Sequence, residues 1–127
     1  MKINLNRIIL FVANVETLKD FYVNVLHLDI VEEIKNEWLV LRAGPCELAL
    51  HKMGDEYKNS AEVSAKSGSN TKIVFDIDED IFSFADKLRE INMTITEVKT
   101  WENFDYWLCD GQDPEGNIFQ LRQKRPA

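Results

Sequence analysis

The chain of 127 residues contains few of the residues that mark common functional sites. Its two cysteines, Cys46 and Cys109, lie far apart and form no CxxC pair, so the sequence indicates neither a cysteine metal site nor a redox motif. We expect both to be reduced core or sheet residues. There is no glycine-rich phosphate loop. No apolar run approaches the ~20 residues of a membrane span, and the N-terminal residues lack a signal-peptide pattern, so we expect a cytoplasmic protein without a membrane partner.

Positive charge is scarce as well. The chain has 15 Lys and Arg against 22 Asp and Glu, which gives a formal net charge of -7 and an isoelectric point near 4.8. This charge repels phosphate backbones, so nucleic acid is not an expected partner. It favours a cationic ligand or serves only to keep the chain soluble. Hydrophobic residues make up 45% of the chain, which is enough for one compact core.

Two halves of the sequence share one pattern of expected elements. Residues 7 to 12 align with residues 72 to 77 at an offset of 65 residues. In each half, a strand is followed by helical spacing of apolar residues and then by three more short strands. Asn14 is the expected N-cap of the first helix. The expected strands are Arg7–Val12, Ile30–Ile34, Trp38–Arg42, Glu47–Lys52, Lys72–Ile77, Thr94–Trp101, Phe104–Cys109 and Ile118–Arg122.

One βαβββ unit cannot bury its apolar sheet face alone, so two units should pair. The pairing occurs either within one chain or between two chains of a swapped homodimer. We therefore predict an α+β fold in which two tandem βαβββ modules form a curved mixed sheet cup with helices on the outer face. A single domain spans residues 1–127, with module one at about 5–52, a linker at 53–71 and module two at about 72–122.

The pattern resembles the vicinal oxygen chelate superfamily of glyoxalases, bleomycin-resistance proteins and extradiol dioxygenases. The resemblance rests on "FVANVETLKDFYVNVLHLDIVEE" near the start and on "DPEGNIFQL", a tight turn feeding the last strand. It implies that His27, where relatives commonly carry Gly, ends the first helix at positive φ. Members that are metalloenzymes place ligands on the first, fourth, fifth and eighth strands, usually His or Gln, Glu, His and Glu. The corresponding positions here are Arg7, Glu47 (or Ala49 after a shift of two residues), Lys72 and Gln120.

These four positions face the inside of the cup by side-chain alternation, but they suit a metal poorly. Arg7 has no available lone pair, and Lys72 would have to lose its proton. Glu47 and Gln120, even with His51, are too few donors for a tight transition-metal site. We therefore predict no metal and no cofactor, with Gln120 recognising a small polar molecule. Alternatively, Gln120 bonds to Arg7 or to a backbone group, and Arg7 and Lys72 form an internal ion cluster around Glu47.

Aromatic residues supply the remaining candidates for ligand contact. Flat rings hold planar ligands by stacking, although tryptophan is equally common in plain cores and dimer interfaces. His51 could act as a base, but no recognisable nucleophile accompanies it, and no residue is predicted to be catalytic. The predicted ligand-binding residues are Arg7, Phe11, Trp38, Glu47, His51, Lys72, Trp101, Trp107 and Gln120.

The leading hypothesis is a metal-independent, homodimeric binding protein that sequesters an antibiotic-like or planar small molecule. One alternative is a divalent-metal-dependent glyoxalase-like lyase or isomerase, or a dioxygenase, that draws donors from Glu47, His51, Gln120 and a further residue such as Asp76. Another is an interaction or regulatory module that uses the fold without a ligand.

Overall fold

The computed structural model describes residues 1–54 and 70–126, which belong to two compact units. The linker predicted at residues 53–71 lies largely outside the described residues. The fold is α+β, as predicted, with one mixed sheet and one helical segment in each unit. Within the described ranges, no helix is long and apolar enough to cross a membrane.

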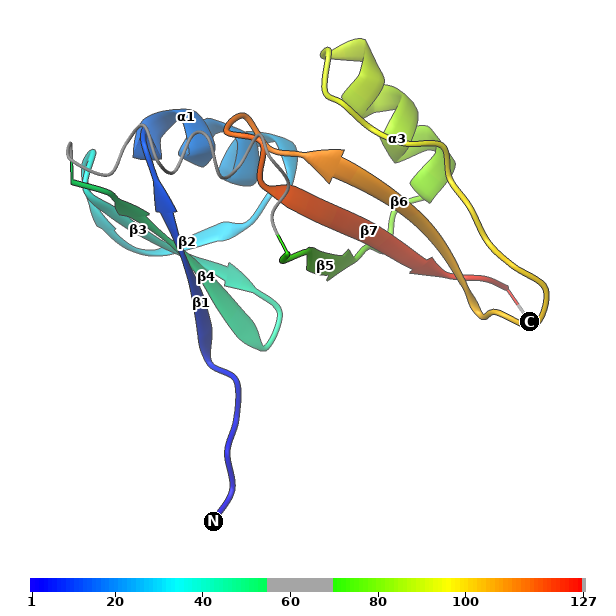
Figure 1. Ribbon diagram of the computed structural model, residues 1–127, viewed down its shortest axis with the longest axis horizontal. Coiled ribbons are helices and arrows are strands. Elements are labelled where there is room, and N and C mark those ends of the chain that lie inside the picture. Colours follow the sequence, from blue (N-terminus) through cyan, green and yellow to red (C-terminus); the bar gives the residue numbers. More distant parts are fainter. Residues whose placement is uncertain (55–69, 127) are drawn as a thin grey trace. The chain divides into compact units, whose positions relative to one another are not determined.

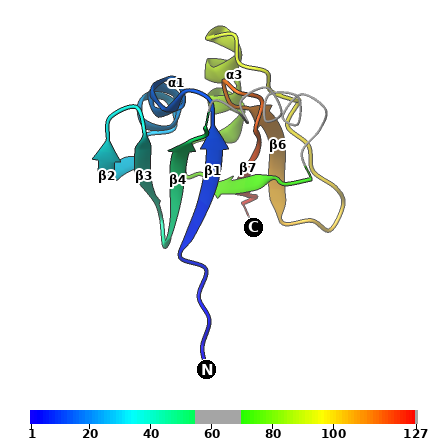
Figure 2. The same ribbon diagram turned by 60° about the vertical axis from the view of Figure 1, so that its left-hand side comes forward.

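The first unit is built on a four-stranded sheet with the order β1-β4-β3-β2. Figure 2 shows these strands side by side. β1 runs parallel to β4, and the other neighbours are antiparallel. The strands are β1 (Arg7–Val12), β2 (Asp29–Ile34), β3 (Trp38–Ala43) and β4 (Cys46–Lys52). All four confirm strands that the hydrophobic pattern predicted, to within one residue at each end.

The helix of this unit begins and ends as the sequence predicts. α1 (Val15–Lys19) continues as the π-helical turn η1 (Asp20–Val25). The side chain of Asn14 caps the helix, because its Oδ1 accepts the Thr17 N–H at 3.1 Å. His27 has a φ of 61°, which confirms the expected helix end in the left-handed region.

The helical segment covers one face of the first sheet. It buries Val15, Leu18, Phe21 and Tyr22. The leucines of β3 and β4 that alternate toward the helix are buried as well, namely Leu39, Leu41, Leu48 and Leu50. The face of each sheet that points away from its helix is called the distal face below.

The second unit has a three-stranded sheet with the order β5-β7-β6. β5 (Ile73–Asp76) runs parallel to β7 (Ile118–Lys124), and β6 (Tyr106–Gln112) is antiparallel to β7. The helix α3 (Ile81–Glu90) lies over β6 and β7 in Figure 1. The pairing of β5 with β7 thus repeats the parallel pairing of β1 with β4, which agrees with the repeat in the sequence.

α3 is tied to this sheet by polar and apolar contacts. Gln123 of β7 accepts the Ile81 N–H at 2.9 Å and donates to the Glu79 carbonyl at 2.8 Å, so it occupies the N-terminus of the helix. The buried residues between helix and sheet are Ile81, Phe84, Ala85, Leu88, Cys109, Phe119 and Leu121. Burial raises the pKa of the Cys109 thiol to about 11, so this core cysteine stays protonated.

The strand predicted at Thr94–Trp101 is not a strand in the structure. This segment makes only two isolated bridges to β6, between Ile95 and Gly111 and between Lys99 and Leu108. The strand predicted at Phe104–Cys109 is shifted as well, because β6 begins at Tyr106 and continues to Gln112.

Side chains replace backbone groups in the ladder of the 94–101 segment. The Thr96 hydroxyl accepts the Asp110 N–H at 2.9 Å, and the Thr96 carbonyl accepts a bond from Arg89 Nη2 at 3.0 Å. Threonine side chains compete with the backbone for such partners. An alternating pattern alone did not reveal that the ladder would be interrupted here.

The "DPEGN" turn leads into β7, as predicted. Asp113 is 4% exposed, and its Oδ1 accepts the N–H groups of Glu115 and Asn117 at 2.9 and 3.0 Å. Gly116 has a φ of 84°, a conformation that side chains other than glycine rarely adopt. The turn therefore fixes where β7 begins, and with it the position of Gln120.

We expect Gly111→Ala to lower the free energy of unfolding by about 1–3 kcal/mol, the usual cost of overpacking. A Cβ at this position would lie 2.5 Å from Phe119 Cζ and 2.6 Å from Ile95 Cδ1. Urea unfolding followed by circular dichroism measures the change. If the ring is the cause, adding Phe119→Leu will cost less in the Gly111→Ala background than in the wild-type chain. Strict additivity of the two changes would contradict the clash.

Candidate functional site

Three rows of side chains cross the distal face of the first sheet, because the strand register sets residues of β1, β4 and β3 opposite one another. The ionic row holds Arg7, Glu47 and Arg42; the small row holds Ile9, Ala49 and Val40; and the aromatic row holds Phe11, His51 and Trp38. Four of the predicted ligand-binding residues besides Arg7 are thereby gathered on this face.

Glu47 is the centre of the ionic row and is only 8% exposed. Its Oε1 accepts from Arg7 Nε at 3.0 Å and lies 2.8 Å from Arg7 Nη2. Its Oε2 lies 3.2 Å from Arg42 Nη2. Two guanidinium groups therefore compensate one buried carboxylate, as charge burial requires. The two cations expected around Glu47 were Arg7 and Lys72. In the described residues, the second cation is Arg42, which was not among the predicted site residues.

The aromatic row consists of rings in contact. The His51 ring centroid lies 5.3 Å from that of Phe11 and 5.6 Å from that of Trp38. Phe11 is 64% exposed. The His51 ring is inclined by 60° to Phe11 and by 74° to Trp38, so the rings meet edge to face, an arrangement in which aromatic rings attract one another.

Two members of the small row, Ala49 and Val40, are covered by the neighbouring rows, whereas Ile9 is 45% exposed. The guanidinium carbon of Arg7 lies 5.6 Å from the centroid of the Trp38 ring, a cation–π distance. Because these residues belong to opposite rows, their side chains lean toward each other across Ala49 and Val40. Both small residues are completely buried. The polar and aromatic rows thus form one packed surface.

On the distal face of the second sheet, Gln120 bonds to an acidic neighbour. Its Nε2 donates to Asp110 Oδ1 at 3.0 Å, and Lys72 Nζ donates to Asp110 Oδ2 at 2.8 Å. Gln120 therefore has a side-chain partner, Asp110, other than the Arg7 or backbone group considered from the sequence. Register places Asp110 directly opposite Gln120. Asp110 was not among the site residues predicted from the sequence. The alternation of β6 indicates that Asp110 faces away from the helix, whereas the register decides its partner.

A second ion pair lies on the same face. Arg122 Nε and Nη2 donate to the two Asp76 oxygens at 2.6 and 3.1 Å, and the Arg122 guanidinium carbon lies 4.0 Å from the Tyr106 ring centroid. The hydrogen bond from Arg122 holds the pKa of the Asp76 carboxyl below its ordinary value. Asp76, the further metal donor considered from sequence, is therefore committed to Arg122.

The two remaining tryptophans lie elsewhere in the second unit. Trp107 is opposite Gln123 on the helix side of β6, where its ring meets Phe82 of α3 edge-on at 5.1 Å. Trp101 lies before β6, is 57% exposed and packs edge-on against Phe104 at 5.3 Å. Neither shares a sheet face with Gln120.

The strand registers indicate whether Glu47 or Ala49 is the fourth-strand position that corresponds to Gln120. β1 pairs Ile9 with Ala49, and β5 pairs Val74 with Gln120. The offset of 65 residues relates Ile9 to Val74. Ala49 is therefore the equivalent of Gln120 in the repeat, and Glu47 belongs to the neighbouring row.

The side chains at these positions do not fit a metal ion. Arg7 and Ala49 have no available lone pair, and Lys72 forms an ion pair with Asp110. Glu47 is engaged by two arginines. Among the described residues, no group of three or more His, Cys, Asp or Glu side chains is placed to hold a metal.

Comparison with known protein families identifies the family of this chain. The model of the Glyoxalase/Bleomycin resistance protein/Dioxygenase superfamily matches residues 4–121. The chain belongs to this superfamily. The resemblance carried by the first helix and the "DPEGN" turn is thereby confirmed. Comparison with curated protein sequences gives no match.

Solved structures of superfamily type share the fold at low identity. TnmS3, an antibiotic-binding protein from Streptomyces sp. CB03234, is 18% identical with a TM-score of 0.71, and the match covers 98% of each chain. Lactoylglutathione lyase from Agrobacterium tumefaciens is 14% identical with a TM-score of 0.69, covering 94% of this chain and 92% of the other. An integron cassette protein of V. cholerae is 22% identical with a TM-score of 0.69, covering 97% of each chain. These likenesses concern the fold.

We expect Glu47→Gln to lower the free energy of unfolding by about 1–3 kcal/mol, because the hydrogen-bonded pair with Arg7 and the ion pair with Arg42 both lose the carboxylate charge. The arginine side chains are 33% and 48% exposed, so water limits the loss. Glu37→Gln is the matched control, since its pair with Lys52 spans 3.8 Å between exposed side chains and should contribute less than about 1 kcal/mol. Equal urea midpoints for the two variants would contradict a structural role of Glu47.

The Asp76–Arg122 pair predicts a dependence of stability on pH. The pKa of Asp76 is lowered on folding, so its contribution is present above its ordinary value of 3.8 and is lost as the pH falls through the lowered value. Asp76→Asn should therefore destabilise the chain at neutral pH, and the difference should shrink in acid. Urea unfolding of the variant and the wild-type chain, from neutral pH down through the pKa of Asp76, measures this difference in the free energy of unfolding. In an Arg122→Gln background the dependence should vanish, and its persistence would assign it to another group.

Proposed function

We propose that this member of the superfamily binds a small planar ligand without a metal and sequesters it without turnover. The observation that carries the proposal is the donor set: Arg7, Ala49 and Lys72 occupy three positions at which the family resemblance implies metal ligands, and none supplies a lone pair. Gln120 alone supplies a neutral oxygen donor. A binding protein needs no electrophile at these positions, whereas the metalloenzymes of the superfamily do.

The aromatic row supplies the ligand surface in this proposal. Phe11, His51 and Trp38 are adjacent rings on one sheet face, and stacking on such rings stabilises planar molecules. Arg7 would fix the orientation of polar groups on this face, and Gln120 remains a separate candidate for ligand contact on the second sheet. The printed description of TnmS3 as an antibiotic-binding protein supports a ligand of that general kind.

The other predicted contacts have different parts in the proposal. Glu47 and Lys72 hold neighbouring side chains through their ion pairs. Trp107 contacts α3 through Phe82 and is left out of the ligand surface, and so is Trp101. We further propose that the chain acts as a cytoplasmic homodimer, which light scattering of the purified protein would test. A monomer would contradict this part alone.

Metal analysis separates this proposal from a metal-dependent lyase or dioxygenase. Protein purified without chelator should contain far less than one transition-metal ion per chain, since the donor set is inadequate. About one tightly held ion per chain would overturn the proposal and favour the enzyme, because a site of high affinity keeps its metal through purification.

Thermal-shift screening with planar aromatic compounds tests ligand binding itself. A ligand present at about 100 times its dissociation constant adds about 2.7 kcal/mol of stability. Trp38→Leu should abolish the ligand-induced rise in Tm, because it removes a ring of the aromatic row. Trp107→Leu is the matched control and should keep the full rise despite a lower starting Tm. The absence of a rise for every compound would favour an interaction module without a ligand.

A further inference from the structure

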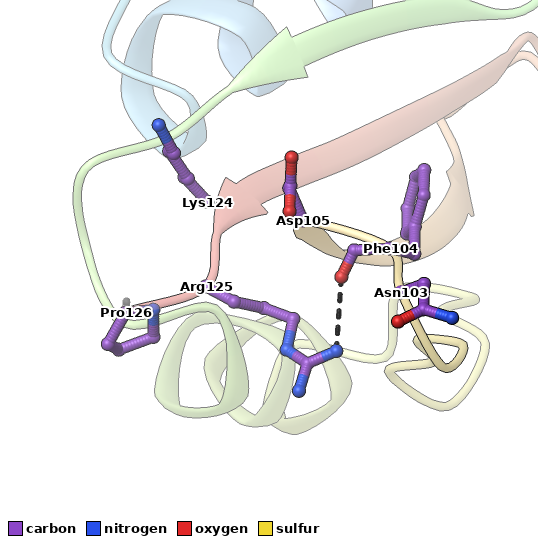
Figure 3. A pocket seen from close by; sticks show the side chains of 6 residues that line it. All are labelled: Asn103, Phe104, Asp105, Lys124, Arg125 and Pro126. Atoms are coloured by element: carbon purple, nitrogen blue, oxygen red, sulfur yellow. Dashed lines mark hydrogen bonds between the residues drawn. The ribbon is translucent and has the colours of Figure 1, made fainter.

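The second unit contains a hollow of about 430 Å³ between the segment before β6 and the end of β7. Figure 3 shows the lining residues, which are Asn103, Phe104, Asp105, Lys124, Arg125 and Pro126. The Arg125 N–H donates to the Asp105 carbonyl at 2.7 Å, so backbone bonding joins the two segments. The volume lies in the range of small-molecule pockets.

Arg125 carries a charge that no carboxylate balances among the described residues. Its Nη1 donates to the carbonyls of Phe104 and Trp101 at 3.0 and 3.3 Å and to the Thr100 hydroxyl at 3.3 Å. Figure 3 shows the side chain reaching to the Phe104 carbonyl. All three acceptors are neutral, and they hold the guanidinium group in one place. A half-buried guanidinium group without an opposite charge is a favourable site for an anion.

The rest of the lining adds to this positive charge. Lys124 has no ion-pair partner within the described ranges. Asp105 is the one carboxylate among the six lining residues, and it forms no ion pair with Lys124 or Arg125. The lining therefore has a net charge of about +1 in a chain with a net charge of -7. Such a local reversal of sign favours an acidic ligand.

The apolar part of the hollow is aromatic. Phe104 is 36% exposed, and its ring centroid lies 5.3 Å from that of Trp101 and 6.0 Å from that of Tyr106. Trp101 and Tyr106 support Phe104 from behind, and the Phe104 ring itself gives the hollow an apolar surface on which a flat ring could pack. The chemistry of the lining therefore combines cationic donors with an aromatic surface.

We propose that this hollow binds small aromatic carboxylates. Arg125 and Lys124 hold the carboxylate, and Phe104 contacts the ring. The site is formed by the second unit alone and shares no residue with the aromatic row or with Gln120. It therefore stands independently of the function proposed above.

Titration of isotopically labelled protein with 2-naphthoate tests the site by NMR. The backbone signals of residues 103–105 and 124–126 should move together and saturate. The neutral amide 2-naphthamide has the same ring and nearly the same shape, and should bind there about tenfold more weakly, as expected for the loss of one charge-assisted interaction. The spectrum also shows whether each variant is folded.

Arg125→Gln should weaken the binding of 2-naphthoate about tenfold and leave the weaker binding of 2-naphthamide nearly unchanged. Arg125 also anchors the loop before β6, so Lys124→Gln provides a second variant in which that anchor is intact. It should weaken 2-naphthoate several-fold. Lys35→Gln makes the same change of net charge in the first unit and should leave the affinity unchanged.

Four results would overturn the proposal. Equal affinity for the acid and the amide would show that charge has no part, and an unchanged affinity in both variants would show that these cations have none. Signals that move only near Trp38 would place 2-naphthoate on the aromatic row, which would support the proposed function while excluding the hollow. A complete lack of change at millimolar 2-naphthoate would also exclude it.

Discussion

The buried carboxylate of Glu47 is the constraint on which the distal face of the first sheet depends. Its position between Arg7 and Arg42 follows from the register of three strands, parallel on one side and antiparallel on the other. A shift of one residue would turn Glu47 into the apolar layer beneath the helix, where no arginine could reach it. The ion pairs and the register therefore stabilise each other. The same arrangement directs Arg7 toward Trp38.

Ion pairs also engage the carboxylates on the distal faces of the two sheets. On the distal faces, Glu47, Asp76 and Asp110 each contact Lys or Arg. A carboxylate that is already bonded to a guanidinium or ammonium group is a poor metal ligand, since a divalent ion would have to displace that cation. At Arg7 and Lys72, two positions where the family resemblance implies metal ligands, the chain has cations that pair with Glu47 and Asp110.

Two surfaces remain available for a ligand, the aromatic row and the hollow. The aromatic row in the first unit offers rings without a committed charge, whereas the hollow in the second unit offers cations whose bonds go to neutral oxygens. The two surfaces therefore favour different ligands. The negative charge of the whole chain acts on ligands at both surfaces. Salt screens these long-range interactions, so the contacts at bonding distance decide which ligand is bound.

The sequence by itself determined the α+β class, the order of elements in the first unit and the cap at Asn14, because these depend on local periodicity and backbone preference. Through the family resemblance, it also indicated the helix end at His27. It also identified the family, through motifs that are contiguous in the chain. Only the tertiary structure decided which charges meet: Arg42 joins Glu47 and Asp110 joins Gln120 because strands distant in sequence pair in one register. Pairing between strands is non-local, so periodicity cannot reveal it.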